Sequence, residues 1–204
     1  ICPLSIVPIR TLPDDCSEMS SQLLYGEHFK ILEQRKKWSK IRTAYDGFEG
    51  WVANNQIVVL LEEDFQGLCD VEALDLSSDI ISHICTSEGL LMPILLGSSI
   101  NGSSLLKHSF EGLCTNHKME REGLVDIAFL YVKSPYLNGG RTPFGIDAAG
   151  FAQMVYKIGG YALKRTAEEQ SKQGEPLSFI EESEPGDLAF FDNNEGTIDH
   201  VGII

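Results

Sequence analysis

Apolar and charged side chains alternate along the first part of the chain, and a period of two is typical of half-buried β-strands. The alternation is clearest at Phe29–Ile31 and Lys40–Arg42, and a turn at residues 45–48 precedes a further strand at Glu49–Val52. Short strands separated by turns predict a small SH3-like β-barrel over residues 1–60.

The pattern is weaker over residues 62–121. Asp75–Cys85 predicts a short helix, Gly89–Leu96 predicts a strand, and polar, glycine-containing stretches around residues 97–104 predict loops. We interpret this part as a second, diverged SH3-like module.

From residue 122 onward, apolar positions recur with the period of a helix. A capping box, Thr166-x-x-Glu169, opens a further helix that we expect to close at Gly174. Strand-like runs finish the chain at Asp187–Asp192 and His200–Ile204. These signals predict an α+β region over residues 122–204. Its first two helices carry their apolar faces at Leu124, Ile127, Ala128 and Tyr131, and at Phe151, Met154, Val155 and Ile158.

Composition excludes several classes of function. A formal charge of −14 argues against a nucleic-acid partner, because phosphate binding needs clustered lysine and arginine. No apolar run is long enough to span a bilayer. Five cysteines without tight spacing do not indicate a disulfide framework, and Cys114-x-x-His117 is a lone pair without a second pair at zinc-like spacing. We expect neither a metal nor a cofactor.

The segment Gly145–Phe151 carries the strongest chemical signal. A glycine-permitted turn leads to Asp147, a favourable N-cap, and then to the first turn of a helix. A cysteine at position 148 would sit where the helix dipole and unpaired amides lower its pKa and where adjacent amides can bind an oxyanion. The residue there is Ala148. His200 opens a strand after a polar loop, where the fold can bring a base to this position.

Six motifs form one ordered pattern within residues 122–204: Pro135-Tyr136-Leu137-Asn138-Gly139-Gly140, Gly145–Phe151, Gln153–Tyr156, Arg165–Gln170, Pro185–Phe191 and Asp199–Ile203. In order and spacing they resemble the NlpC/P60 family of cell-wall cysteine peptidases, which have a papain-like α+β fold. The resemblance covers residues 122–204, and Gly26–Val52 resembles bacterial SH3 domains.

The resemblance implies a hydrolase that cleaves peptidoglycan stem peptides, or muropeptides, between D-glutamate and the diamino acid. It implies that position 148 is the nucleophile, His200 the general base, and Tyr136 the hydroxyl near the reacting carbonyl. Asp147 and the residue at 149 would help to bind the free amine of L-alanine, and Glu49 of the first SH3-like module is our candidate for a further acid at that amine. The resemblance is compatible with the cell envelope and with cytoplasmic recycling.

Three departures from the family pattern open alternatives. Ala148 replaces the nucleophilic cysteine, which implies a silent enzyme whose alanine is either engineered or natural. Ala149 stands where many members have serine, and Asn138 where relatives have a large aromatic residue; both favour a natural pseudoenzyme that binds peptidoglycan fragments or a protein partner. A pure interaction module is the third alternative. Because the chain stops at Ile204, we expect a further segment or another chain to complete the sheet and supply the third catalytic residue.

Overall fold

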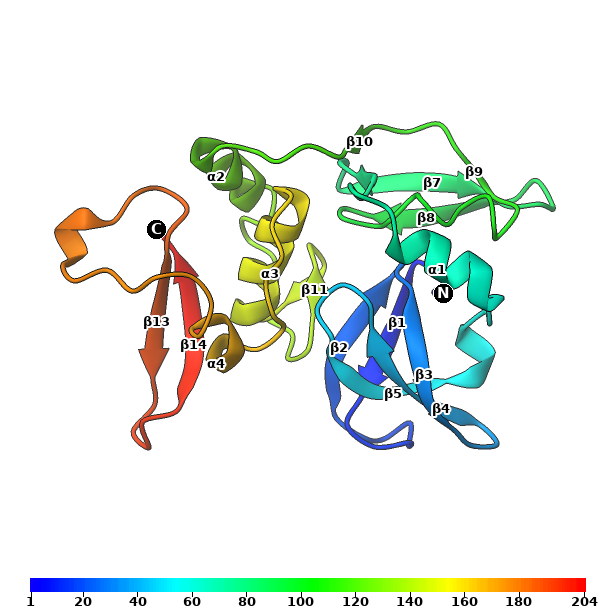
Figure 1. The fold of residues 1–204 in the computed structure, drawn as a ribbon, viewed down its shortest axis with the longest axis horizontal. Coiled ribbons are helices and arrows are strands. Elements are labelled where there is room, and N and C mark those ends of the chain that lie inside the picture. The colour runs from blue at the N-terminus through cyan, green and yellow to red at the C-terminus, as the bar shows by residue number, and fades with distance from the viewer.

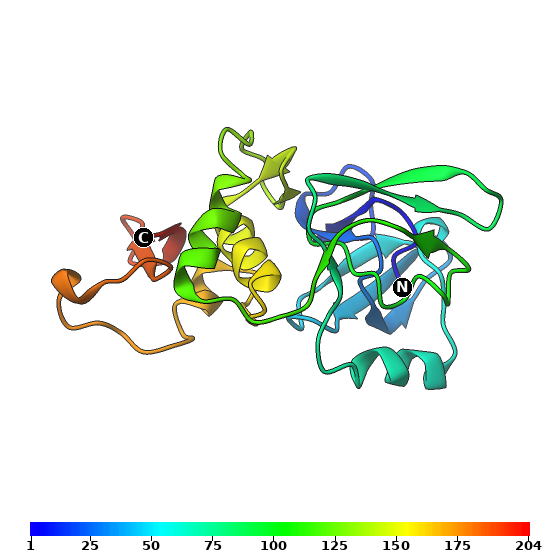
Figure 2. The same ribbon diagram turned by 90° about the horizontal axis from the view of Figure 1, so that it is seen from above.

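The computed structural model describes all 204 residues, arranged as an α+β fold in three groups of elements (Figure 1). We call residues 1–60 the N-terminal module, residues 62–121 the middle module and residues 122–204 the C-terminal module. Helix α3 lies between the N-terminal module and the C-terminal hairpin, in both Figure 1 and the perpendicular view of Figure 2. None of the helices combines the length and the apolar character that crossing a bilayer requires.

The N-terminal module is a five-stranded antiparallel sheet with the strand order β2-β1-β5-β4-β3. The strands expected from the alternating pattern are confirmed, and β4 pairs with β5 across the predicted turn. Trp51 is buried, with the guanidinium of Arg35 4.4 Å from its ring centroid. The elements are β1 (Ile6–Arg10), β2 (Met19–Leu24), β3 (Phe29–Gln34), β4 (Trp38–Thr43), β5 (Glu49–Ala53) and the 3-10 turn η1 (Asn54–Gln56).

The middle module contains two small sheets, β8-β7-β9 and β10-β6, and one helix. The helix expected at Asp75–Cys85 is wrong: these residues form β6 and β7, because Ser82 and Ile84 face inward while their neighbours face outward, which is the period of a strand. The strand expected at Gly89–Leu96 is confirmed as β8. The elements are α1 (Glu62–Cys69), β6 (Leu76–Ser77), β7 (Ile81–Cys85), β8 (Leu91–Leu95), β9 (Ser109–Phe110) and β10 (Cys114–Thr115).

The C-terminal module places helices beside a β-hairpin. Its predicted helices and strands are present, but α4 ends at Gln170, short of the expected Gly174, and the last strand begins before His200. Strands β13 and β14 pair only with each other. The elements are α2 (Arg121–Phe129), β11 (Arg141–Thr142), β12 (Gly145–Ile146), α3 (Ala148–Ile158), α4 (Ala167–Gln170), η2 (Ile180–Glu182), β13 (Leu188–Asp192) and β14 (Ile198–Ile203).

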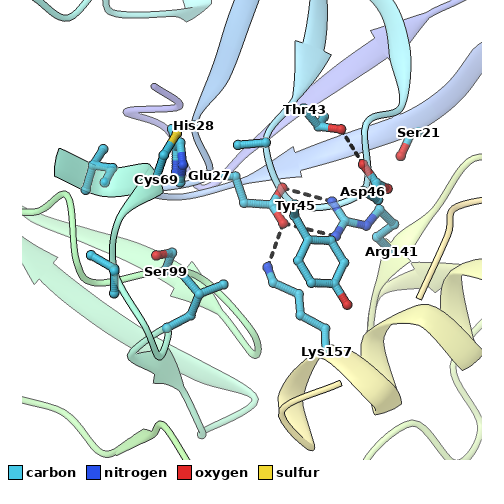
Figure 3. A pocket seen from close by; sticks show the side chains of 14 residues that line it. Ser21, Glu27, His28, Thr43, Tyr45, Asp46, Cys69, Ser99, Arg141 and Lys157 are labelled. Carbon is cyan, nitrogen blue, oxygen red and sulfur yellow. Dashed lines mark hydrogen bonds and ion pairs between the residues drawn. The ribbon is translucent and has the colours of Figure 1, made fainter. Parts of the chain in front are cut away.

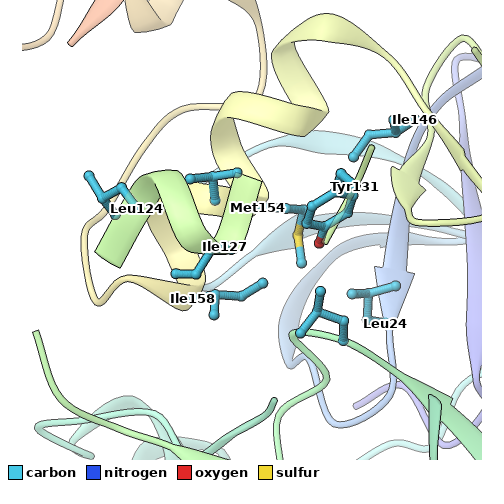
Figure 4. Packing of buried hydrophobic residues seen from close by; sticks show 9 residues of the cluster. Leu24, Leu124, Ile127, Tyr131, Ile146, Met154 and Ile158 are labelled. Atoms are coloured by element: carbon cyan, nitrogen blue, oxygen red, sulfur yellow. The ribbon is translucent and has the colours of Figure 1, made fainter. Parts of the chain in front are cut away.

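The largest hydrophobic core is shared by all three modules (Figure 4). Leu24 of the N-terminal module and Leu96 of the middle module, both fully buried, pack against the apolar faces of α2 and α3. Tyr25, next in the chain, is buried between Ile84 and Ile94 of the middle module. The modules therefore complete one another's cores. The C-terminal members of the shared core are Leu124, Ile127, Tyr131, Ile146, Met154, Val155 and Ile158.

Gly26 directly follows the buried Leu24 and Tyr25 and offers a test of this packing. A Cβ atom there would lie 1.8 Å from the carbonyl oxygen of Ser99, and its φ is +75°. We expect Gly26→Ala to destabilise the protein by about 3 kcal/mol or more, because clash adds to the cost of a left-handed conformation. Gly89 has a φ of +77° and open space around it, so Gly89→Ala should cost only about 1 kcal/mol. Urea denaturation measures both, and equal losses would contradict the close approach of the modules.

Candidate active site

The loop before position 148 is folded by close backbone approaches. Tyr136 forms a parallel bridge with Ile146, and its side chain is exposed. Gly139 has a φ of +75° and abuts the backbone of Met19 in the N-terminal module, where a Cβ would lie 2.3 Å from the Met19 oxygen. Gly140 packs equally closely on the backbone of Gly145. Glycines are thus required where the loop meets both β12 and the N-terminal module.

Asp147 is the N-cap of α3, as its sequence context predicts. Its carboxylate accepts four hydrogen bonds, from the amide of Gly150 (2.6 Å), the amide of Gly139 (2.8 Å), and the two terminal nitrogens of Arg165 (3.1 and 2.7 Å). Arg165 is buried and its Nε donates to Ser21 of the N-terminal module (3.0 Å). A carboxylate has about four acceptor positions, so the hydrogen-bonding capacity of Asp147 is filled within the protein.

Ala148 begins α3 and is half-buried against a small apolar cluster that includes Ala152, Leu163 and Val201. The amides of Ala148 and Ala149 donate to no group within the chain, as expected for the first turn of a helix. The helix start therefore presents two free donors beside position 148, where an anion is favoured.

His200 lies in β14, a strand that packs against α3 through Val201. Side chains alternate along a strand, so His200 lies on the opposite face from Val201. Its ring is 5.8 Å from that of Phe191, its neighbour across the hairpin, and it forms no hydrogen bond. The structure thus brings β14 to α3, and the approach of the imidazole to position 148 stays a prediction.

The two remaining predicted residues differ in placement. Ala149 is half-buried at the helix start, and its carbonyl oxygen accepts a hydrogen bond from Gln170 (2.9 Å). Glu49 is instead paired within its own sheet, with Lys40 at 2.9 Å and Arg42 at 2.6 Å. The hydrogen bonds from these two cations hold the pKa of Glu49 below its usual value. Its carboxylate is therefore already paired with two cations of its own sheet.

A different acid of the N-terminal module contacts that loop. Glu18 is exposed and accepts a hydrogen bond from the side-chain amide of Asn138 (2.7 Å), next to Gly139. No local sequence signal indicates this contact, because the two residues are 120 positions apart.

A buried charge network joins Glu27 of the N-terminal module to Arg141 and Lys157, which lie before and after position 148 in the chain (Figure 3). The carboxylate of Glu27 accepts from the two terminal nitrogens of Arg141 (2.8 and 3.0 Å) and from Nζ of Lys157 (2.6 Å). All three side chains are at most 8% exposed. The sequence analysis predicted none of these three residues. One signal was present: Gln153 and Lys157 lie four positions apart on the buried side of α3, and a polar residue there needs a buried partner.

Burial opposes ionisation of Glu27, but the charges of Arg141 and Lys157 overcome it and lower its pKa to about 2. Burial also lowers the pKa of Lys157, against the attraction of Glu27. A cavity of about 210 Å³ adjoins the network, between the N-terminal module, the α1 region and α3. Its lining includes His28, Tyr45 and Asp46 together with the three charged residues of the network (Figure 3).

Comparison with known proteins identifies two domains in the chain. The model described as the bacterial dipeptidyl-peptidase SH3 domain matches residues 9–57, and the NlpC/P60 family model matches residues 133–204. Residues 133–204 are an NlpC/P60 domain. The match to the NlpC/P60 model contains the glycine loop, Asp147, position 148 and His200.

Two curated relatives align with most of this chain. A gamma-D-glutamyl-L-lysine dipeptidyl-peptidase of Bacillus subtilis is 24% identical, over 91% of this chain and 69% of the relative. Dipeptidyl-peptidase 6 of Lysinibacillus sphaericus is 26% identical, over 88% of this chain and 76% of the relative. The crystal structure of an NlpC/P60 family protein from Bacillus cereus has the same fold, with a TM-score of 0.84 at 16% identity, covering 100% of this chain and 86% of that one.

The depressed pKa of Glu27 predicts a pH-dependent stability. The pKa of its carboxyl is about 2 in the folded protein against an ordinary value of 4.5, so its stabilising contribution is complete above pH 4.5 and is lost as the pH falls toward 2. We expect the stability difference between the unchanged protein and Glu27→Gln to shrink by on the order of 3 kcal/mol across this window.

Urea denaturation at a series of pH values and constant ionic strength measures this difference. Glu33→Gln is the matched control, because Glu33 pairs with Arg35 on the surface of the same module. A Glu27→Gln difference that does not change with pH would contradict the assignment of a buried, ionised carboxylate.

Proposed function

We propose that this chain is the scaffold of a peptidoglycan stem-peptide hydrolase, which cleaves between D-glutamate and the diamino acid when a cysteine occupies position 148. The observation that carries the proposal is the start of α3: a capped helix end with two free amides beside position 148, after a loop that an acid of the N-terminal module contacts. The name of the Bacillus subtilis relative, a gamma-D-glutamyl-L-lysine dipeptidyl-peptidase, supports the same bond specificity.

The proposed chemistry is acyl transfer to a thiolate. The sulfur at position 148 attacks the γ-carbonyl carbon of D-glutamate, and the amides of residues 148 and 149 hold the resulting oxyanion. His200 takes the thiol proton and gives it to the amine of the departing diamino acid. Water then releases the acyl group, with His200 as base. Tyr136, exposed on the preceding loop, is the proposed hydroxyl near the reacting carbonyl.

Glu18 takes the role first expected of Glu49 in this proposal. The substrate's free α-amine is a cation, and the Asp147 carboxylate already accepts four hydrogen bonds. Glu18 is exposed and lies beside Asn138, so it has acceptor positions left for an ammonium. Asp147 then orients the helix start, and Ala149 shapes the floor of the amine site.

Binding without cleavage is the second candidate function. The methyl group of Ala148 cannot attack a carbonyl, and Ala149 offers no hydroxyl to an amine. A protein that keeps the residues proposed to contact substrate and lacks the nucleophile would retain muropeptide fragments without hydrolysing them.

Restoring the nucleophile distinguishes the two candidates. We expect Ala148→Cys to hydrolyse L-Ala-γ-D-Glu-L-Lys, because the helix start favours a thiolate. Release of lysine is followed by mass spectrometry, and the unchanged protein and Ala148→Cys/His200→Ala serve as controls. Binding of the peptide without turnover by Ala148→Cys would favour the second candidate, and the absence of both would contradict the proposed substrate class.

The role of Glu18 predicts a specific loss. In the Ala148→Cys background, Glu18→Gln should lower kcat/KM about tenfold or more for the peptide with a free amine, because a hydrogen bond to a charged group is lost. The N-acetylated peptide lacks the cation, so its slower turnover should not change. An equal loss for both peptides would contradict an amine site at Glu18.

A further inference from the structure

We propose that Glu27 is a positioning residue: one carboxylate of the N-terminal module fixes the turn before position 148 and the helix after it. This inference rests on the proposed function of that site. It assigns the N-terminal module a part in catalysis that is separate from any contact with substrate.

The carboxylate is held rigidly on its own module. Glu27 follows the left-handed Gly26, and its Oε2 also accepts from the amide of Leu24 (2.9 Å). Leu24 is itself fully buried in the shared core. The anion therefore has a fixed place before it contacts any other module.

Its two cations lie on either side of position 148. Arg141 is in β11, directly after Gly140, whose carbonyl oxygen accepts from the amide of Asp147 (3.4 Å). Lys157 is in the last turn of α3, the helix that Ala148 begins. A movement of Glu27 would thus be transmitted to the turn through Arg141 and to the helix through Lys157.

Each cation is also fixed by a second contact. The backbone amide of Arg141 donates to Oε1 of Gln22 (2.7 Å), and its guanidinium donates to the Gln22 carbonyl oxygen (2.6 Å). Lys157 donates to the carbonyl oxygen of Gly97 in the middle module (2.9 Å). The network therefore connects all three modules at a point behind the proposed active site, and it includes none of the residues proposed to touch substrate.

The pKa of a cysteine thiol introduced at position 148 tests the proposal, because the proposal and simple electrostatics predict opposite shifts when Glu27 is substituted. Removing the negative charge of Glu27 would, by electrostatics alone, lower the pKa of a nearby thiol. Loss of positioning has the opposite effect, because the helix start no longer stabilises the thiolate. In the Ala148→Cys background, we expect Glu27→Gln to raise the pKa of the introduced thiol by about half a unit, so that alkylation at neutral pH slows about threefold.

The rate of iodoacetamide alkylation against pH is measured on the peptide that contains position 148, which separates the introduced thiol from the five cysteines already in the chain. In the same proteins, kcat should fall about tenfold with little change in KM, because geometry at the reacting atoms is lost while binding contacts remain. Glu33→Gln, on the surface of the same module, should change neither quantity.

A folded Glu27→Gln protein in which the introduced thiol has an unchanged or lowered pKa would overturn the proposal. If Glu27→Gln does not fold, Glu27→Asp decides the question, because it keeps the negative charge while withdrawing the carboxylate from its two cations, and it should give a smaller change in the same direction. Alkylation requires no peptidase activity, so a failure of the proposed function, seen as absent turnover, is distinguishable from a failure of positioning.

Discussion

The arrangement of the molecule depends on one buried carboxylate that neutralises two buried cations. Glu27, Arg141 and Lys157 have left water, and the cost of their desolvation is offset only while all three remain in contact. The anion and the cations belong to different modules. Separation of the N-terminal and C-terminal modules would therefore leave unpaired charges in an apolar setting, and the pair must behave as one body.

Apolar packing also holds the three modules together. Leu24, Tyr25 and Leu96 are each fully buried, and each completes a core of a module other than its own. Lys157 reaches the middle module as well, through the carbonyl oxygen of Gly97. The middle module thus supplies both an apolar side chain and a hydrogen-bond acceptor behind α3. These contacts give it a physical role in supporting the helix that presents position 148.

Local signals in the sequence were sufficient for most elements and insufficient for the partners. Helical periodicity located α2 and α3, and the residue type at Asp147 predicted its capping bond, because both depend on near neighbours. The helix prediction for Asp75–Cys85 was wrong because the alternating burial of these residues depends on the pairing of β7 with β8, which a short local pattern does not reveal. Glu27 bonds to residues 114 and 130 positions away, and such pairs are set by the packing of modules. The contact of Glu18 with the loop before position 148 could not be predicted from the sequence for the same reason.

The geometry at position 148 can persist without a nucleophile. The helix start is ordered by Asp147, Arg165 and Gly139, and none of these contacts involves the side chain of Ala148. The ordered helix start is therefore explained by folding and is not by itself evidence of activity.

Side chains that contribute little to folding say more about function. The side chain of Tyr136 is 77% exposed, and the exposed imidazole of His200 lies 5.8 Å from the ring of Phe191 and forms no hydrogen bond. Packing does not account for either side chain, so their roles are tested by activity and not by the fold.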